Sequence, residues 1–392
     1  MRALHLAIAG LALGASTLVA QTPPQAPPLK KWEYLVLPAL NFNSDEGVGY
    51  GVLLEAYNYG RGVRPYRFVV QPTVLMTTRG RRDVTVFFDA PGVFPAGWRL
   101  DAFAGREQEL AAPYYGVGND TQHDTTLARD PNPYFYRYGR ERVRLQANVH
   151  RQLGGTNVRA LFGAGYASVR TDAIPFDSGT TLFASDFASP PRGILVFART
   201  GVVWDTRDRE VGARSGWWNE LLVQHVDEAL GASHTYTRLT GTVRRYVPIS
   251  SRLTGAGRLL VQQSSGDVPV YDLATVQSSY KQEEGLGGSK MLRGIPKNRV
   301  VGKGVVLVNT ELRWRAVDFP LLGKPAFLQL SSFADAGRVW SESIRLDELT
   351  SDLWSGYGGG VRLGLGENSV IALDVGRSSS ATQIYIGLGY AY

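Results

Sequence analysis

Hydrophobic and polar residues alternate with a period of two over many segments of this chain. In 142–150 every even position is polar, and the odd positions are Val143, Leu145, Ala147 and Val149. The same alternation returns in 252–262, 302–315 and 368–377. A period of two predicts β-strands with one hydrocarbon face and one polar face.

Sixteen segments carry this pattern, and an even number is typical of single-chain bacterial barrels. The predicted strands are 33–42, 48–58, 66–77, 83–90, 98–105, 134–150, 156–169, 193–205, 215–226, 234–246, 252–262, 302–315, 325–337, 355–365, 368–377 and 382–392. The long connections between them are 106–133, 170–191, 263–301 and 338–354. The sequence therefore predicts an all-β fold, a transmembrane antiparallel β-barrel of about sixteen strands.

The first thirty residues differ from the rest. A basic start, an apolar run from Leu6 to Val19 and a small residue at Ala20 predict a signal peptide over 1–20. A Pro-rich linker over 21–31 follows, and the barrel is expected over 32–392. Only about ten residues then separate the expected cleavage point from the first strand.

Composition supports a barrel in the bacterial outer membrane. The chain has 45 Gly and 19 Tyr, no Cys and five His, with a net charge of +7. The missing Cys excludes disulfides and thiolate sites, and the five His are scattered, so we expect no metal and no cofactor. No Lys-rich run accompanies the charge, so we expect no nucleic-acid partner. The sequence lacks recognisable catalytic motifs, so we expect no enzyme.

Three motifs occur in order near the C-terminus. The connection 263–301 contains Leu292-Arg293-Gly294-Ile295, the next strand carries Glu311-Leu312-Arg313, and the strand after it carries Phe333-Ala334-Asp335-Ala336-Gly337. Upstream, Trp204 to Asp208 and Tyr114 to Asn119 fit the same pattern. This arrangement resembles the bacterial surface antigen family, the outer-membrane barrels of BamA and TamA type. The likeness extends over nearly the whole chain after residue 32.

The resemblance implies that a long loop folds into the lumen and that Arg293 pairs there with Glu311 and Asp335. Strand parity agrees independently, because both acids lie on the polar faces of their strands. Gly294 would allow a tight turn beside the wall. From the residues alone, a solvated loop charge is the simpler interpretation of Arg293. Two features depart from the family: Ile295 replaces an aromatic residue, and the expected boundaries leave no room for a POTRA domain.

The last predicted strand ends the chain in an amphipathic pattern. One face carries Ile384, Ile386, Leu388, Tyr390 and Tyr392. This resembles the C-terminal signal through which barrels of this kind reach the outer-membrane assembly machinery, although the usual last residue is Phe. We therefore expect that machinery to be a partner during insertion, with outer-membrane lipids around the finished barrel.

The resemblance implies a role in outer-membrane assembly or in protein or lipid translocation, which would need a weak seam between strands 33–42 and 382–392. One alternative is a passive porin-like channel for small anions, because many arginines fall on lumen parity: Arg99, Arg142, Arg144, Arg159, Arg199, Arg252 and Arg258. Another is a structural barrel that works with a separate partner protein, for example one in the periplasm. Glu283-Glu284 is interpreted as a solvated pair in the long loop.

Overall fold

The structure is a computed structural model that describes residues 31–38, 41–43, 47–63, 65–95, 97–129, 132–177, 179–321, 323–366 and 369–392. The expected signal peptide and nearly all of the expected linker lie outside the described residues. Within those residues, no helix combines the length and hydropathy needed to cross a bilayer.

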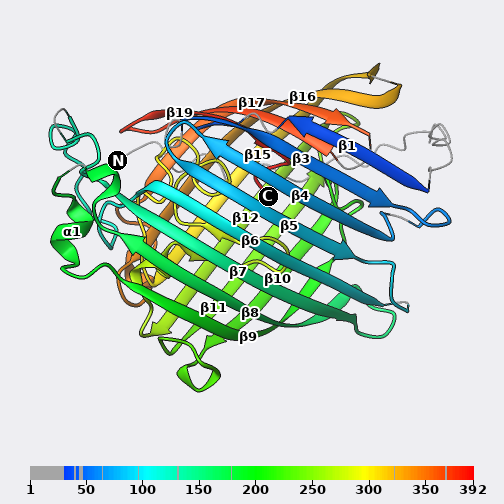
Figure 1. Ribbon diagram of the computed structural model, residues 1–392. Helices are drawn as coiled ribbons and strands as arrows, with labels where there is room; N and C mark the ends of the chain where they lie inside the picture. Colours follow the sequence, from blue (N-terminus) through cyan, green and yellow to red (C-terminus); the bar gives the residue numbers. More distant parts are fainter. Residues whose placement is uncertain are drawn as a thin grey trace.

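Antiparallel strands dominate the fold (Figure 1). They are β1 (Trp32–Pro38), β2 (Asn41–Asn43), β3 (Gly47–Asn58), β4 (Phe68–Thr77), β5 (Arg81–Ala90), β6 (Trp98–Pro113), β7 (Arg137–Gln152), β8 (Val158–Asp172), β9 (Arg192–Asp205), β10 (Gly216–Val226), β11 (Tyr236–Pro248), β12 (Leu253–Gly266), β13 (Thr275–Val276), β14 (Glu283–Glu284), β15 (Gly304–Leu321), β16 (Lys324–Trp340), β17 (Trp354–Leu365), β18 (Ser369–Arg377) and β19 (Thr382–Leu388). The short helices are α1 (Leu182–Asp186), α2 (Val270–Leu273) and the 3₁₀ turns η1 (Pro175–Asp177), η2 (Glu228–Leu230) and η3 (Leu346–Glu348).

Sixteen strands form the barrel wall, as the alternation predicts. β1 and β2 both pair with β3 and together make the first wall strand. Each later wall strand pairs with its successor in the chain, up to β18 with β19. The small β13–β14 pair belongs instead to the connection between β12 and β15.

The two ends of the barrel differ in the length of their connections. One end, called here the loop end, has the long connections 114–136, 173–191, 267–303 and 341–353. The other, the turn end, has shorter connections such as 153–157 and 249–252. In outer-membrane barrels the short turns face the periplasm.

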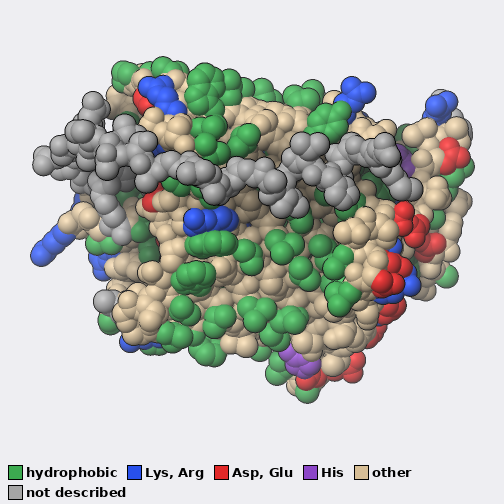
Figure 2. All heavy atoms as spheres, turned by 180° about the vertical axis from the view of Figure 1, so that it is seen from behind, with side chains coloured by type: hydrophobic (Ala, Val, Ile, Leu, Met, Phe, Trp, Pro, Cys, Tyr) green, Lys and Arg blue, Asp and Glu red, His purple; other side chains and the backbone are tan. Residues whose placement is uncertain are grey.

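The wall is apolar outside and polar inside. On β7, the side chain of Leu145 is 51% exposed on the outer face, whereas Asn148 is 1% exposed inside. On β15, Val308 and Leu312 point outward while Glu311 is buried. Figure 2 shows hydrophobic side chains spread over the outer wall, with charged side chains mostly toward the ends. This arrangement suits a wall whose outer face contacts lipid and whose lumen is polar.

Several predicted boundaries were wrong, mostly because strands extend beyond the bilayer-spanning length. β6 runs to Pro113 and not 105, and β15 runs to Leu321 and not 315. Main-chain pairing with a neighbouring strand continues past the stretch of strict alternation. The connection predicted at 263–301 is 267–303.

The last strand also ends earlier than predicted. β19 stops at Leu388, and Gly389 has a φ of +74°, a conformation that glycine adopts without strain. The four residues Gly389–Tyr392, called here the tail, turn into the lumen. Tyr390 and Tyr392 therefore leave the face on which Ile384 and Leu388 lie exposed, contrary to the expected single face.

This turn leaves a narrow junction between the first and last wall strands, called here the seam. Among the described residues, which leave out 39–40 and 44–46, two pairs join β19 to β2, namely Tyr385 with Asn43 and Ile386 with Phe42. Continued in the same register, Tyr392 would lie opposite Val36. Within the described residues β1 pairs with β3 alone, so its other edge has no strand partner.

Candidate functional site

The connection 267–303, called here the lumen loop, folds into the barrel. Its apolar residues Leu286, Met291, Leu292, Ile295 and Val300 are nearly inaccessible to solvent. They form one cluster with wall residues of β12, β15 and β16. Burial of these side chains draws the loop against the wall, at about 25 cal/mol per Å² of apolar surface.

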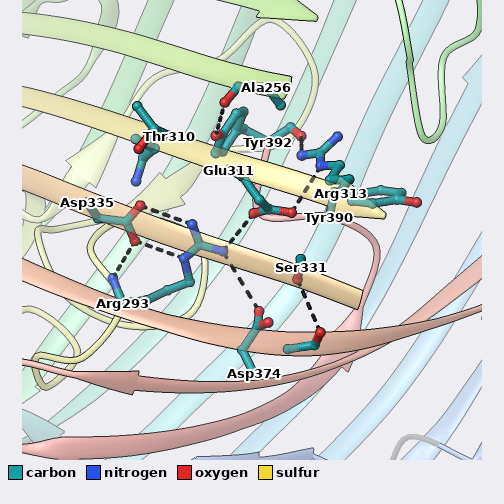
Figure 3. A network of polar contacts seen from close by, with 12 residues as sticks. Ala256, Arg293, Thr310, Glu311, Arg313, Ser331, Asp335, Asp374, Tyr390 and Tyr392 are labelled. Atoms are coloured by element: carbon teal, nitrogen blue, oxygen red, sulfur yellow. Dashed lines mark hydrogen bonds and ion pairs between the residues drawn. The ribbon is translucent and has the colours of Figure 1, made fainter. Parts of the chain in front are cut away.

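Arg293 is the centre of the polar contacts at this wall (Figure 3). Its Nε and Nη2 donate to the two carboxylate oxygens of Asp335 at 2.8 and 3.0 Å, and its Nη1 donates to Glu311 at 2.8 Å. The backbone N–H of Arg293 also donates to Asp335, at 3.0 Å. None of the three side chains is exposed to solvent. The guanidinium lies 3.5 Å from the ring centre of Phe333, which adds a cation–π contact.

Further charges surround this pair. Arg313 donates to Glu311 at 3.0 Å, and Arg362 donates to Asp374 at 2.7 and 2.9 Å. Asp374 in turn lies 4.0 Å from the guanidinium of Arg293. Together with Asp335 these residues make a network of three arginines and three acids with no net charge. Such balance is what makes buried charges tolerable, because each one is paired and hydrogen-bonded.

Gly294 passes the wall at very short range. Its φ is +98°, and a Cβ there would lie 2.7 Å from the backbone carbon of Arg377. Its N–H donates to the hydroxyl of Tyr385 at 3.1 Å, and that hydroxyl donates to the carbonyl of Ile295 at 3.3 Å. An aromatic side chain from the last wall strand thus contacts the loop where the family pattern has its own aromatic.

A second ion cluster fixes the loop to the opposite wall. Glu284 accepts from Arg140 at 2.8 Å and from Arg142 at 3.1 Å, and Lys297 lies 3.0 Å from it. Lys297 also donates to Glu109 at 2.8 Å. Burial alone would raise the pKa of Glu284, but Arg140, Lys297 and Arg142 outweigh it and hold that pKa well below its ordinary value. Glu284 is therefore not the solvated charge that its sequence context indicates.

Comparison with known proteins identifies the family. A family model described as the Omp85 superfamily domain matches residues 77–378. The chain belongs to the Omp85 superfamily. A search of the curated proteins finds no match.

Solved structures share the fold of this Omp85 barrel. BamA from Haemophilus ducreyi lacking POTRA domains 1–3 aligns with a TM-score of 0.58 and 12% identity, covering 91% of this chain and 69% of that one. CdiB from Escherichia coli aligns with a TM-score of 0.61 and 10% identity, covering 92% and 63%. CdiB from Acinetobacter baumannii gives 0.52 and 11%, covering 92% and 60%. The chain thus spans less than two thirds of the two CdiB chains. These matches place the Omp85 barrel in the bacterial outer membrane, as its sequence predicts.

The arginines expected on the lumen side of this Omp85 barrel fall into two groups. Arg99, Arg142 and Arg258 are buried inside the barrel, where each donates to a polar side chain, and most of the others lie there as well. Arg252 is the exception, because it lies in the exposed turn between β11 and β12. Asp205 pairs with Arg159 and Arg207 at the turn end, which fits structural charge pairing.

The tail brings two aromatic side chains into the lumen of the Omp85 barrel. The hydroxyl of Tyr392 donates to the carbonyl of Ala256 at 3.1 Å, and Arg313 donates to the backbone oxygen of Tyr392 at 3.3 Å. Arg313 also lies 4.3 Å from the ring centre of Tyr390. Lys290 of the lumen loop donates to the carbonyls of Leu388 and Tyr390 at 2.8 and 2.6 Å. The loop, the tail and the seam strand are therefore in direct contact.

Proposed function

We propose that this Omp85 barrel acts in outer-membrane assembly, or in moving protein or lipid across that membrane, by opening at its seam. The observation that carries the proposal is the edge of β1 that faces β19, which has no strand partner among the described residues, beside two described pairs between β2 and β19. The neighbouring β18–β19 ladder has seven pairs. Because unpaired backbone groups cost several kcal/mol each in hydrocarbon, a junction with few pairs opens at the lowest cost.

The lumen loop supports this function over a passive anion channel. Three loop residues contact different strands of the wall. Lys281 donates to Gln71 on β4, and Glu284 accepts from arginines of β7. Arg293 donates to acids on β15 and β16. The loop therefore crosses the lumen between facing walls. The arginines that would attract anions are largely occupied by carboxylates or carbonyls. A passive channel would instead show steady conductance of small anions in a planar bilayer.

A disulfide across the seam tests the proposal, and the absence of cysteine from the chain makes the background clean. Phe42→Cys with Ile386→Cys joins β2 to β19, where the two residues are paired. Leu373→Cys with Ile386→Cys is the matched control, because it joins β19 to β18 within the longer ladder. Each pair is expressed in the native bacterium depleted of the wild-type protein, and the outer-membrane proteins and lipids are quantified.

We expect the oxidised seam pair to fail to restore the outer membrane, and reduction to restore it. The control pair should work in both states. Full activity of the oxidised seam pair would contradict opening at the seam. It would leave the barrel as a structural module.

We also propose that the turn end contacts a separate periplasmic protein, and that the assembly machinery inserts the barrel. The first of these is tested by crosslinking and pull-down from outer membranes with the barrel as bait. A turn-end variant such as Arg252→Glu should lose the captured protein, whereas the loop-end variant Arg345→Glu should keep it. Equal capture by both variants would contradict a turn-end contact.

A further inference from the structure

A cavity of about 340 Å³ lies in the lumen on the side of the tail. Lysines of the lumen loop, Lys281 and Lys290, line it together with Arg244 and Trp218 of the wall. It adjoins a second cavity of about 690 Å³ at the turn end, with which it shares Arg313 and Tyr390. The first cavity can therefore be reached from the turn end.

The cations of this cavity differ from the other lumen charges in their partners. In the part of the chain that the structure describes, no carboxylate lies within ion-pair distance of Arg244, Lys281 or Lys290. Lys281 donates to the amide oxygen of Gln71 at 3.1 Å, and Lys290 donates to the backbone carbonyls of Leu388 and Tyr390. Arg244 stacks 4.9 Å from the ring centre of Trp218.

Two buried donors at the same cavity lack any partner. They are the Nε of Arg244 and the indole Nε1 of Trp218. Buried donors are nearly always hydrogen-bonded in folded proteins, so two orphans beside one cavity mark a place for an acceptor. Both belong to cavity-lining residues that are neighbours across the β10–β11 ladder.

The charges here are unbalanced, in contrast to those around Arg293. Glu283 is the acid that acts on all three cations, since Lys290, Arg244 and Lys281 each influence its ionisation. Glu55, which also lines the cavity, acts on Lys281 as well. Three cations against these two carboxylates leave one uncompensated positive charge. A phosphate monoester carries about −1.5 to −2 at neutral pH and offers three acceptor oxygens. Arginine and lysine are the side chains that commonly bind phosphate.

We propose that this cavity binds a phosphate monoester group, held by Arg244, Lys281 and Lys290 with Trp218 as a further donor. The source is either a lipid headgroup such as that of phosphatidic acid or a free phosphate. A cavity of this volume admits a headgroup or a small phosphorylated solute but no folded polypeptide. The proposal does not depend on opening at the seam.

The pKa of Lys290 links anion binding to pH. Burial lowers the pKa of Lys290 to about 8, with Arg362 and Lys281 acting in the same direction and Glu283 and Asp374 opposing them. A bound anion would favour the charged lysine, so binding and protonation are coupled. Affinity for the anion should therefore fall as the pH rises through about 8.

Isothermal titration calorimetry on the full barrel in an uncharged detergent tests the site. The probes are inorganic phosphate and short-chain phosphatidic acid, with short-chain phosphatidylcholine and potassium chloride of equal ionic strength as controls. The variants are Arg244→Gln, Lys281→Gln and their combination. Arg345→Gln is the matched control, because Arg345 is an exposed arginine of the loop end. Heat-modifiable migration on a detergent gel shows that each variant is folded.

We expect saturable binding of at least one phosphate probe and a weakening of about tenfold or more in the double variant. Arg345→Gln should change the affinity less than about twofold. Binding of phosphatidic acid alone assigns a headgroup, and binding of inorganic phosphate assigns a site for the free ion as well. No saturable binding by either probe, or equal affinity in a folded double variant, would overturn the proposal.

Discussion

Replacing Arg293 by Ala should destabilise the barrel strongly, and the size of the effect follows from the contacts. The side chain makes three hydrogen bonds to two carboxylates, and none of these side chains is exposed. In the variant, Glu311 keeps Arg313 at 3.0 Å, but Asp335 keeps only the backbone N–H of residue 293. Stranding one buried charge costs about 3–5 kcal/mol.

Companion variants separate charge from geometry. Arg293→Lys keeps the charge but loses the planar fork, so it should cost about 1.5–3 kcal/mol, the range for lost charged hydrogen bonds. Asp335→Asn should cost a similar amount, because Arg293 retains Glu311. The double variant should fall short of the sum of the singles by at least about 1 kcal/mol. Arg345→Ala is the exposed control and should stay within about 0.5 kcal/mol.

The assay is urea unfolding in lipid vesicles, followed by the gel shift between folded and unfolded barrel and by protease cleavage of the lumen loop. The loop should become cleavable in Arg293→Ala before the barrel unfolds. Strict additivity in the cycle, or unchanged protection of the loop, would refute the idea that Arg293 locks it.

Three further predictions concern the loop and the tail. Gly294→Ala should destabilise the barrel by at least about 1 kcal/mol more than Gly288→Ala. Both glycines have a positive φ, but only at Gly294 would a Cβ lie 2.7 Å from a neighbouring backbone atom. Equal losses of unfolding free energy in urea would argue against this. Deleting 382–392 should abolish refolding into vesicles, because β18 loses its pairing with β19. Deleting only 389–392 should leave a folded barrel with a lower melting temperature. Refolding of the longer deletion would contradict the argument from strand pairing. The pKa of Glu284 is depressed, so the stabilising effect of this carboxylate is present above pH 4.5 and is lost as the pH falls below that value. Protease cleavage of the lumen loop should therefore increase in acid. Glu284→Gln should remove this acid dependence.

Strand alternation predicts most of the wall because a barrel has only two faces, and each residue type suits one of them. The same parity places Glu311 and Asp335 in the lumen, and the structure brings Arg293 within hydrogen-bond distance of both. Parity also puts Asp374 and Tyr385 on the lumen side. It does not show that they meet the lumen loop, because a loop carries no period that fixes its path.

The tail is the clearest difference from the sequence-based view. Its alternation continues through Tyr392, but contacts decide the outcome. Arg313 and Ala256 offer Tyr392 hydrogen bonds inside the lumen. A buried tyrosine hydroxyl usually needs such a partner. Glu284 is similar, because its arginines lie far away in the sequence on β7.

Hydrogen–deuterium exchange on the purified barrel in lipid tests the central claim, a rigid loop beside a weak seam, most directly. Peptides covering 286–300 should exchange slowly, because that part of the lumen loop is buried and held by Asp335. Peptides from β1 and β19 should exchange faster than those from β7 and β8, which share fourteen residue pairs, because one edge of β1 has no strand partner among the described residues. Seam peptides that exchange as slowly as β7 and β8, or a lumen loop that exchanges as fast as the exposed loop-end connections, would contradict it.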